Sequence, residues 1–162
     1  MMSDNMIKVG MADLNVAQTG GLKTTGLGSC IGVSLYDAKM KIAGLAHVML
    51  PSSELARDTD FNPAKFVDTA IPELIRRMEV LGAQLRRLEA KLAGGAQMFA
   101  FSEGDVLRIG PRNVETCKNL LKQFNIPIIG EDTGGHYGRS IEIHCDTGIV
   151  YIRSVHQGVK EL

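Results

Sequence analysis

The sequence predicts an α+β fold, with all 162 residues in a single domain. This length suits one sizeable hydrophobic core. Hydrophobic residues make up 44% of the chain, an ordinary share for a globular protein. The predicted elements follow the order strands, helix, strand, helix, strands, which is typical of a mixed α+β domain.

Three strands are predicted in the N-terminal third, over residues 6–16, 31–36 and 41–50. The third is apolar at odd and even positions alike, a pattern typical of a strand that is buried on both faces. The polar segment 51–62 follows, and it is long for a connection. It is therefore either a lid or recognition loop, or a mobile linker.

The clearest predicted helix comes next. Asn62 is a suitable N-cap, Pro63 suits the first helical position, and Gly82 ends the helix. Pro72 lies inside this helix and is expected to bend it. Its apolar positions share one helical face, and they are Phe66, Val67, Ala70, Ile71, Leu74, Ile75, Met78 and Leu81.

The rest of the chain predicts a strand, a helix and three further strands. Residues 84–93 have both helical and alternating spacing, and the glycines on either side favour a strand. Residues 111–124 form an amphipathic pattern that predicts a helix. The last strands are predicted over residues 126–130, 140–145 and 149–155, with a hairpin turn at residues 146–148.

Charge and composition exclude several functional classes. The 18 Lys and Arg residues balance 18 Asp and Glu residues, so no overall field attracts nucleic acid or an anionic membrane. Aromatic residues are only 5%, which argues against a base-stacking surface. The 3 widely spaced cysteines include no CxxC pair, as in a reducing compartment. Without a signal peptide or a membrane-spanning run, we expect a soluble cytoplasmic protein.

The stretch TTGLGSCIGV, residues 24–33, raises the question whether Cys30 is a nucleophile or an inert buried thiol. Its glycines permit backbone shapes that could aim N–H groups at a bound carbonyl oxygen, and a catalytic thiol would also need access and a lowered pKa. His47 is the lone polar side chain of an apolar strand and needs a hydrogen-bond partner. That partner could be the thiol or the backbone, and Thr24 or Thr25 could orient the ring.

Metal and phosphate sites are not indicated. No pair of ligands has zinc-like spacing, and adjacent residues such as His144 and Cys145 point to opposite faces of a strand. The glycine-rich residues 131–139 lack the Lys-Ser/Thr of a phosphate loop, so they form a turn or a wall of the active cleft. We expect neither a metal nor an organic cofactor.

Five strings carry a more specific signal. They are GLGSCIGVSLYD (26–37), AGLAHVMLP (43–51), KLAGGAQMF (91–99), IGPRNV (109–114) and EDTGGHYGR (131–139). Together they resemble the CheD family of bacterial chemotaxis proteins, which deamidate glutamines on chemoreceptors. The likeness runs in order through nearly the whole chain, and the N-terminal MIKVGMADLNVA is similar to Bacillus-type members.

The resemblance implies a catalytic site of Cys30 as the thiol, His47 as its base and Thr24 as the third residue. Thr24 is preferred to Thr25 because the family threonine lies six positions before the cysteine. His136 departs from the family pattern, in which asparagine is expected, and an exposed loop histidine is the simpler interpretation. The implied fold is a compact domain of packed β-sheets with outer helices, similar to the catalytic domains of glutamine-deamidating bacterial toxins.

The resemblance also implies a reaction and its partners. The reaction is cofactor-free hydrolysis of glutamine amides on methyl-accepting chemotaxis receptors, which gives glutamate and ammonia, and the same chemistry could cleave a glutamyl methyl ester. The implied partners are chemoreceptor cytoplasmic helices and a CheC-type phosphatase. The alternative is a non-catalytic binding regulator whose cleft docks a receptor or phosphatase helix. A cysteine protease fits the three residues but not the family.

Overall fold

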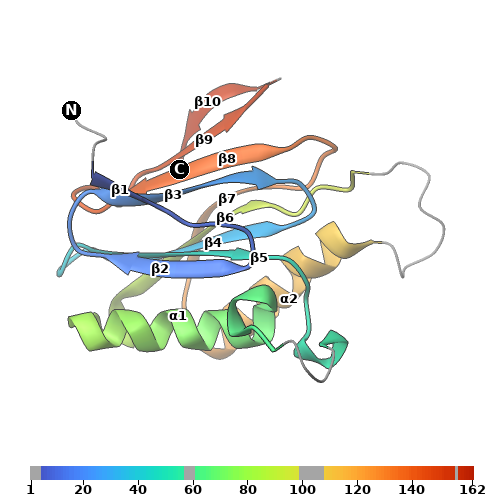
Figure 1. Ribbon diagram of the computed structural model, residues 1–162. Helices are drawn as coiled ribbons and strands as arrows, with labels where there is room; N and C mark the ends of the chain where they lie inside the picture. The colour runs from blue at the N-terminus through green and yellow to red at the C-terminus, as the bar shows by residue number, and fades with distance from the viewer. Residues whose placement is uncertain (1–4, 57–60, 99–107, 156) are drawn as a thin grey trace.

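The computed structural model describes residues 5–56, 61–98, 108–155 and 157–162. Within these ranges, two five-stranded sheets are stacked face to face (Figure 1). In spatial order, the first sheet holds β1 (Met6–Lys8), β3 (Gly21–Leu27), β8 (Arg139–His144), β9 (Val150–Ser154) and β10 (Gly158–Glu161). The second holds β2 (Asp13–Ala17), β5 (Ile42–Val48), β4 (Ile31–Asp37), β6 (Leu88–Gly94) and β7 (Ile128–Thr133).

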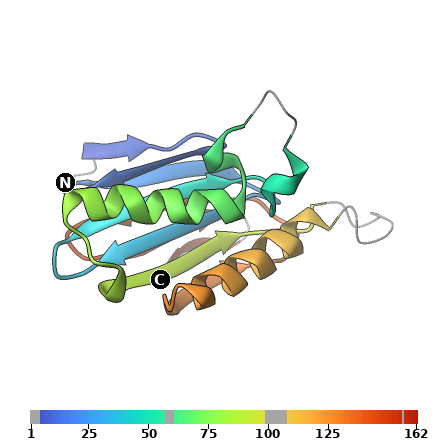
Figure 2. The same cartoon turned by 90° about the horizontal axis from the view of Figure 1, so that it is seen from below.

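Both sheets are mixed. β1 pairs with β3 in parallel, as does β6 with β7, and the other neighbouring pairs are antiparallel. The helices α1 (Val67–Leu81) and α2 (Ile109–Gln123) both lie against the outer face of the second sheet (Figure 2). The prediction of packed sheets with outer helices is therefore confirmed, with the helices on one side only.

Two hydrophobic layers hold the fold together. One fills the space between the second sheet and the helices, and the other fills the space between the two sheets. β4 and β5 are buried at every residue because they are central strands with a packed layer on each face. The prediction that the third N-terminal strand is buried on both faces is confirmed.

The single strand predicted over residues 6–16 is wrong. β1 belongs to the first sheet, whereas β2 lies in the second, and the chain crosses between them with Ala12 at a φ of +56°. The apolar pattern continues through the crossing, so it gave no sign of the change of sheet.

Two strands of the first sheet were absent from the predicted elements. β3 is built from glycines, threonines and a lysine with only two leucines, and β10 is exposed along its whole length. Neither carries the apolar alternation on which strand prediction depends. The hairpin predicted at residues 146–148 is confirmed by the antiparallel pairing of β8 with β9.

The boundaries of several elements also differ from the predictions. Asn62 caps a short 3₁₀ helix, Pro63–Lys65, and α1 begins only after the buried, extended Phe66. α1 continues through Pro72 and ends at Gly82, as predicted. A 3₁₀ turn occupies the start of the strand predicted over 84–93. In the segment 51–62, residues 57–60 lie outside the described residues.

Within the described part of the chain, no helix is long and apolar enough to cross a membrane.

Candidate active site

The three predicted site residues come from both sheets. Thr24 lies in β3 of the first sheet, His47 lies near the end of β5 in the second, and Cys30 directly precedes β4. All three are buried, with exposed fractions of 1%, 1% and 8%. β3 ends, β4 begins and β5 ends at the same end of the sandwich (Figure 1).

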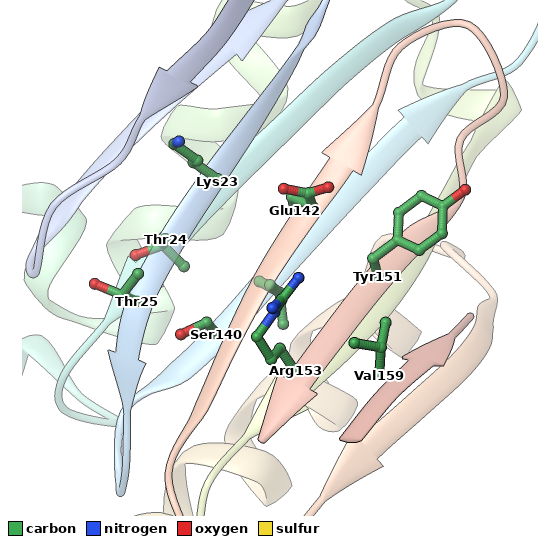
Figure 3. Close-up of a pocket in the computed structure, with 9 residues that line it drawn as sticks. Lys23, Thr24, Thr25, Ser140, Glu142, Tyr151, Arg153 and Val159 are labelled. Atoms are coloured by element: carbon green, nitrogen blue, oxygen red, sulfur yellow. The ribbon is translucent and has the colours of Figure 1, made fainter. Parts of the chain in front are cut away.

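Thr24 and His47 contact each other across the two sheets. Thr24 Oγ1 lies 2.7 Å from His47 Nδ1, a hydrogen-bond distance. Thr25 is exposed and makes no such bond among the described residues; both threonines line a pocket of about 290 Å³ on the first sheet (Figure 3). The structure therefore brings Thr24 and not Thr25 to the imidazole, as the resemblance implies.

Cys30 and His47 share one face of the second sheet. His47 is paired with Gly32, and Cys30 lies two residues before Gly32, so both side chains point into the space between the sheets. Diagonal neighbours of this kind have Cβ atoms about 7 Å apart. Gly32 has no side chain, and Ile141 and Leu27 pack over it, 2.8 and 3.1 Å from where its Cβ would lie.

The two ring nitrogens of His47 differ in their hydrogen bonding. Its Nδ1 contacts Thr24, one of the two threonines expected to orient the ring, and no hydrogen bond from the ring to the thiol or the backbone is found among the described residues. Among the described residues, Nε2 has no hydrogen-bond partner. The ring is thus anchored at one nitrogen, and the other is available on the face that Cys30 shares.

Burial controls the protonation of this pair. Desolvation raises the pKa of the Cys30 thiol above its ordinary 9.0, although the backbone N–H of Cys30 partly offsets this by contacting the sulfur. Desolvation also lowers the pKa of His47 below 6.5. Both groups are therefore neutral at pH 7. The resting thiol therefore does not have the lowered pKa that a catalytic cysteine needs.

The loop that leads to Cys30 is shaped by a glycine and held by an asparagine. Gly26 has a φ of +73°, which favours glycine, at the irregularity that interrupts the β3–β8 pairing. Asn113 in α2 is fully buried, and its Nδ2 lies 3.0 Å from the carbonyl oxygens of both Ser29 and Met49. Sequence analysis missed Asn113. The available signal was a polar residue on the inward face of α2, one turn before the buried Cys117.

Comparisons with known proteins identify the family. The profile described as CheD chemotactic sensory transduction matches residues 49–154. The chain belongs to the CheD family. A chemoreceptor glutamine deamidase CheD from Halalkalibacterium halodurans is 52% identical over 161 residues, which cover 98% of this chain and 99% of that protein. The chemoreceptor glutamine deamidase CheD of Bacillus subtilis is 48% identical over 159 residues, 97% of this chain and 96% of that protein.

The alignment with the CheD relatives spans the positions of the three site residues, whereas the family profile begins after them. The profile begins at Met49, after Thr24, Cys30 and His47. The alignment with the Halalkalibacterium CheD protein covers 98% of the chain and so includes this region. Family membership therefore rests on the whole chain, and the comparisons assign no role to the three residues.

The segment 131–139 of this CheD-family chain lies beside the site. It ends β7 and begins β8, so the interpretation as a turn is confirmed. Gly134 N–H donates to Gly94 O, and Gln97 N–H donates to Gly135 O. His136 is exposed, as expected, and its Nδ1 lies 2.7 Å from Gln97 O.

A search for metal ligands among the described residues finds no cluster of three or more His, Cys, Asp or Glu side chains. His144 is half-buried, and its Nε2 lies 3.0 Å from Glu142 Oε1, whereas Cys145 is buried between the sheets. These adjacent residues therefore do not share a site.

Proposed function

We propose that this CheD-family protein hydrolyses glutamine side-chain amides on chemoreceptors, with Cys30 as nucleophile and His47 as base. Relatives that carry the name chemoreceptor glutamine deamidase match over nearly the full length of the chain. The observation that carries the assignment is the contact of Thr24 Oγ1 with His47 Nδ1. It occupies one ring nitrogen and leaves the other, unpartnered, on the face that holds Cys30.

Thr24 sets the tautomer of the imidazole in this mechanism. When Thr24 Oγ1 accepts the hydrogen of Nδ1, the lone pair of the neutral ring lies on Nε2. Nε2 is the atom that must take the thiol proton. The same hydrogen bond stabilises the imidazolium that forms when Nε2 becomes protonated. Thr24 thus acts through His47, as a positioning residue.

The reaction proceeds in two halves. His47 Nε2 takes the proton of Cys30 while the sulfur attacks the amide carbon of glutamine, which gives a tetrahedral oxyanion that backbone N–H groups stabilise. Nε2 then protonates the nitrogen, the C–N bond breaks, and ammonia leaves a thioester on Cys30. His47 next takes a proton from water, the hydroxyl adds to the thioester carbon, and the thiol departs with that proton. The product is glutamate.

The substrate side chain belongs to a receptor coiled coil, so the site must accept a helix. The conversion of glutamine to glutamate adds a negative charge to that helix, which changes its packing and electrostatics. Binding of receptor cytoplasmic helices and binding of a CheC-type phosphatase both stay predictions.

Incubation with a receptor cytoplasmic fragment tests the proposal. Tryptic peptides of the fragment are expected to show the mass change of glutamine to glutamate at particular positions, with release of ammonia. Peptides that remain unconverted, together with binding of the fragment, would instead favour the non-catalytic regulator.

Replacing Thr24 with valine is expected to lower kcat by about 10- to 100-fold, because the imidazole loses its fixed orientation. It also leaves Nδ1 buried without a partner, which costs about 1–3 kcal/mol of folding free energy. Kinetics should therefore be measured at a temperature at which circular dichroism shows a folded protein. Thr25→Val is the matched control, and an equal loss of kcat in that exposed neighbour would contradict the assignment.

The pH dependence of kcat/KM should reflect the neutral resting pair. Because burial lowers the pKa of His47, we expect the acidic limb below pH 6.5. Because the pKa of Cys30 is raised above 9.0, alkylation by iodoacetamide at pH 7, followed on the Cys30 peptide, should be slower than that of free cysteine. Alkylation faster than free cysteine would show that the thiol is ionised at rest and would contradict this prediction.

The pH dependence of folding stability should reflect the protonation of His47. The unfolded chain takes up a proton at His47 near pH 6.5, whereas the folded protein does so only at lower pH. Stability is therefore lost as the pH falls below 6.5. Thermal unfolding of His47→Gln across this range should lack that contribution, and an unchanged pH dependence would argue against it.

A further inference from the structure

Three successive carbonyl groups of the loop that carries Cys30 are held by neighbouring elements. The donors are the backbone of the segment that follows β6 and the side chain of Asn113 in α2. The bonds are Ala96 N–H to Gly28 O at 2.9 Å, Asn113 Nδ2 to Ser29 O at 3.0 Å, and Gly95 N–H to Cys30 O at 2.8 Å. The orientation of each peptide in the loop is thus fixed from outside.

The middle bond comes from a side chain, and that side chain makes a second contact. Asn113 Nδ2 also donates to the carbonyl of Met49. Met49 is the first residue after β5 and lies two residues beyond His47. Both acceptors are carbonyl oxygens, so the amide can face them only with its nitrogen. One fully buried amide therefore ties the loop before the thiol to the end of the strand that carries the base.

The packing around Asn113 leaves little room for adjustment. A Cβ on Gly110, in the first turn of α2, would lie 2.1 Å from Ala96 O, and a Cβ on Gly95 would lie 2.3 Å from a methyl group of Val114. α2 and the segment 95–96 thus press directly on each other. The three donors act as one rigid support for the loop.

The direction of the Ser29 carbonyl determines the direction of the next N–H. In a trans peptide the C=O and the following N–H point to opposite sides, and the described residues contain no cis peptide. The Ser29 carbonyl points to Asn113, so the N–H of Cys30 points away from α2.

We infer that Asn113 is a positioning residue for deamidation, which holds the Ser29–Cys30 peptide so that the Cys30 N–H donates to the oxyanion formed when the thiol attacks. The inference rests on the proposed function. The donor lies beside the sulfur, where the oxygen of the tetrahedral intermediate forms. Without the amide nitrogen, this peptide can turn, and the oxyanion loses a donor that was oriented before the reaction began.

The test compares two variants with a matched control. Asn113→Asp removes the amide nitrogen at nearly constant size, and Asn113→Ala removes the group altogether. Cys117→Ser is the control, because Cys117 is equally buried one turn along α2 and makes no hydrogen bond to the loop among the described residues. We expect kcat of both Asn113 variants to fall about 10- to 100-fold with a small change in KM, as for loss of an oxyanion donor.

A second readout separates positioning from stability. A receptor peptide in which an aldehyde replaces the glutamine amide adds the Cys30 thiol reversibly, and its oxygen occupies the oxyanion position. Its inhibition constant should weaken in the Asn113 variants by about the same factor as kcat falls. A purely structural role would lower the melting temperature alone, as in Cys117→Ser, and would overturn the inference.

Wild-type protein and Cys30→Ala are assayed in parallel. If the wild type converts no glutamine, or if Cys30→Ala still converts it, the proposed function fails and the inference fails with it. If conversion depends on Cys30 but Asn113→Asp and Asn113→Ala match Cys117→Ser in kcat and aldehyde affinity, only the role of Asn113 is rejected.

Discussion

Replacing Cys30 with alanine is expected to abolish glutamine conversion on a receptor fragment, with a loss of about 10⁴-fold or more. The reason is that Cys30 supplies the thiol on the inter-sheet face that His47 shares, whereas the Ser34 hydroxyl on that face is a weaker nucleophile and donates to Lys91 O. The change removes one sulfur atom from a small buried side chain, so the fold should tolerate it. The measurement is the mass of tryptic receptor peptides after a fixed time with each protein.

Cys145→Ala is the control for this experiment. Cys145 is also buried between the two sheets, and desolvation also raises the pKa of its thiol. It is not one of the proposed site residues, so its loss should leave kcat close to that of the wild type. Glutamine conversion that survives in Cys30→Ala would refute the thiol mechanism. If Cys30→Ala still binds the receptor fragment but converts no glutamine, it could be either a disabled enzyme or a regulator. Glutamine conversion by the wild type identifies an enzyme, and its absence identifies a regulator.

Replacing His47 with glutamine is expected to lower kcat by about 10²- to 10⁴-fold, the usual contribution of general acid–base catalysis. Glutamine keeps a polar group near Thr24 but cannot accept and return a proton. The effect should exceed that of Thr24→Val, because Thr24 acts only through the ring. Steady-state kinetics at pH 7 measure both losses.

His144→Gln controls for a change of histidine at a distance from the site. His144 lies in β8, and its ring packs edge-on against Tyr151. It has no contact with Cys30 or Thr24 among the described interactions, so kcat should not change. A His47→Gln protein that keeps kcat near the wild-type value would show that another group is the base. In that case the lowered pKa of His47 would reflect burial alone.

The candidate site shows where sequence reasoning succeeds and where it stops. His47 stood out because a lone polar group in an apolar strand must find a partner, and the structure supplies one from a strand that the pattern did not predict. β3 has too few apolar residues to be recognised, since its stability comes from pairing with β1 and β8. The choice of Thr24 over Thr25 came from the family resemblance, and the alternation of side chains along β3 explains it.

The sequence by itself determined the α+β class, the buried central strands and the helices, because apolar periodicity and glycine or proline breaks are local properties of the chain. It also singled out Cys30 and His47 and carried the resemblance to the CheD family. Only the tertiary structure decided which sheet each half of the first strand joins, that Thr24 reaches His47 across two sheets, and that Asn113 holds the loop before the thiol. These depend on contacts between residues far apart in the chain, and burial, which sets both pKa shifts, exists only once those contacts form.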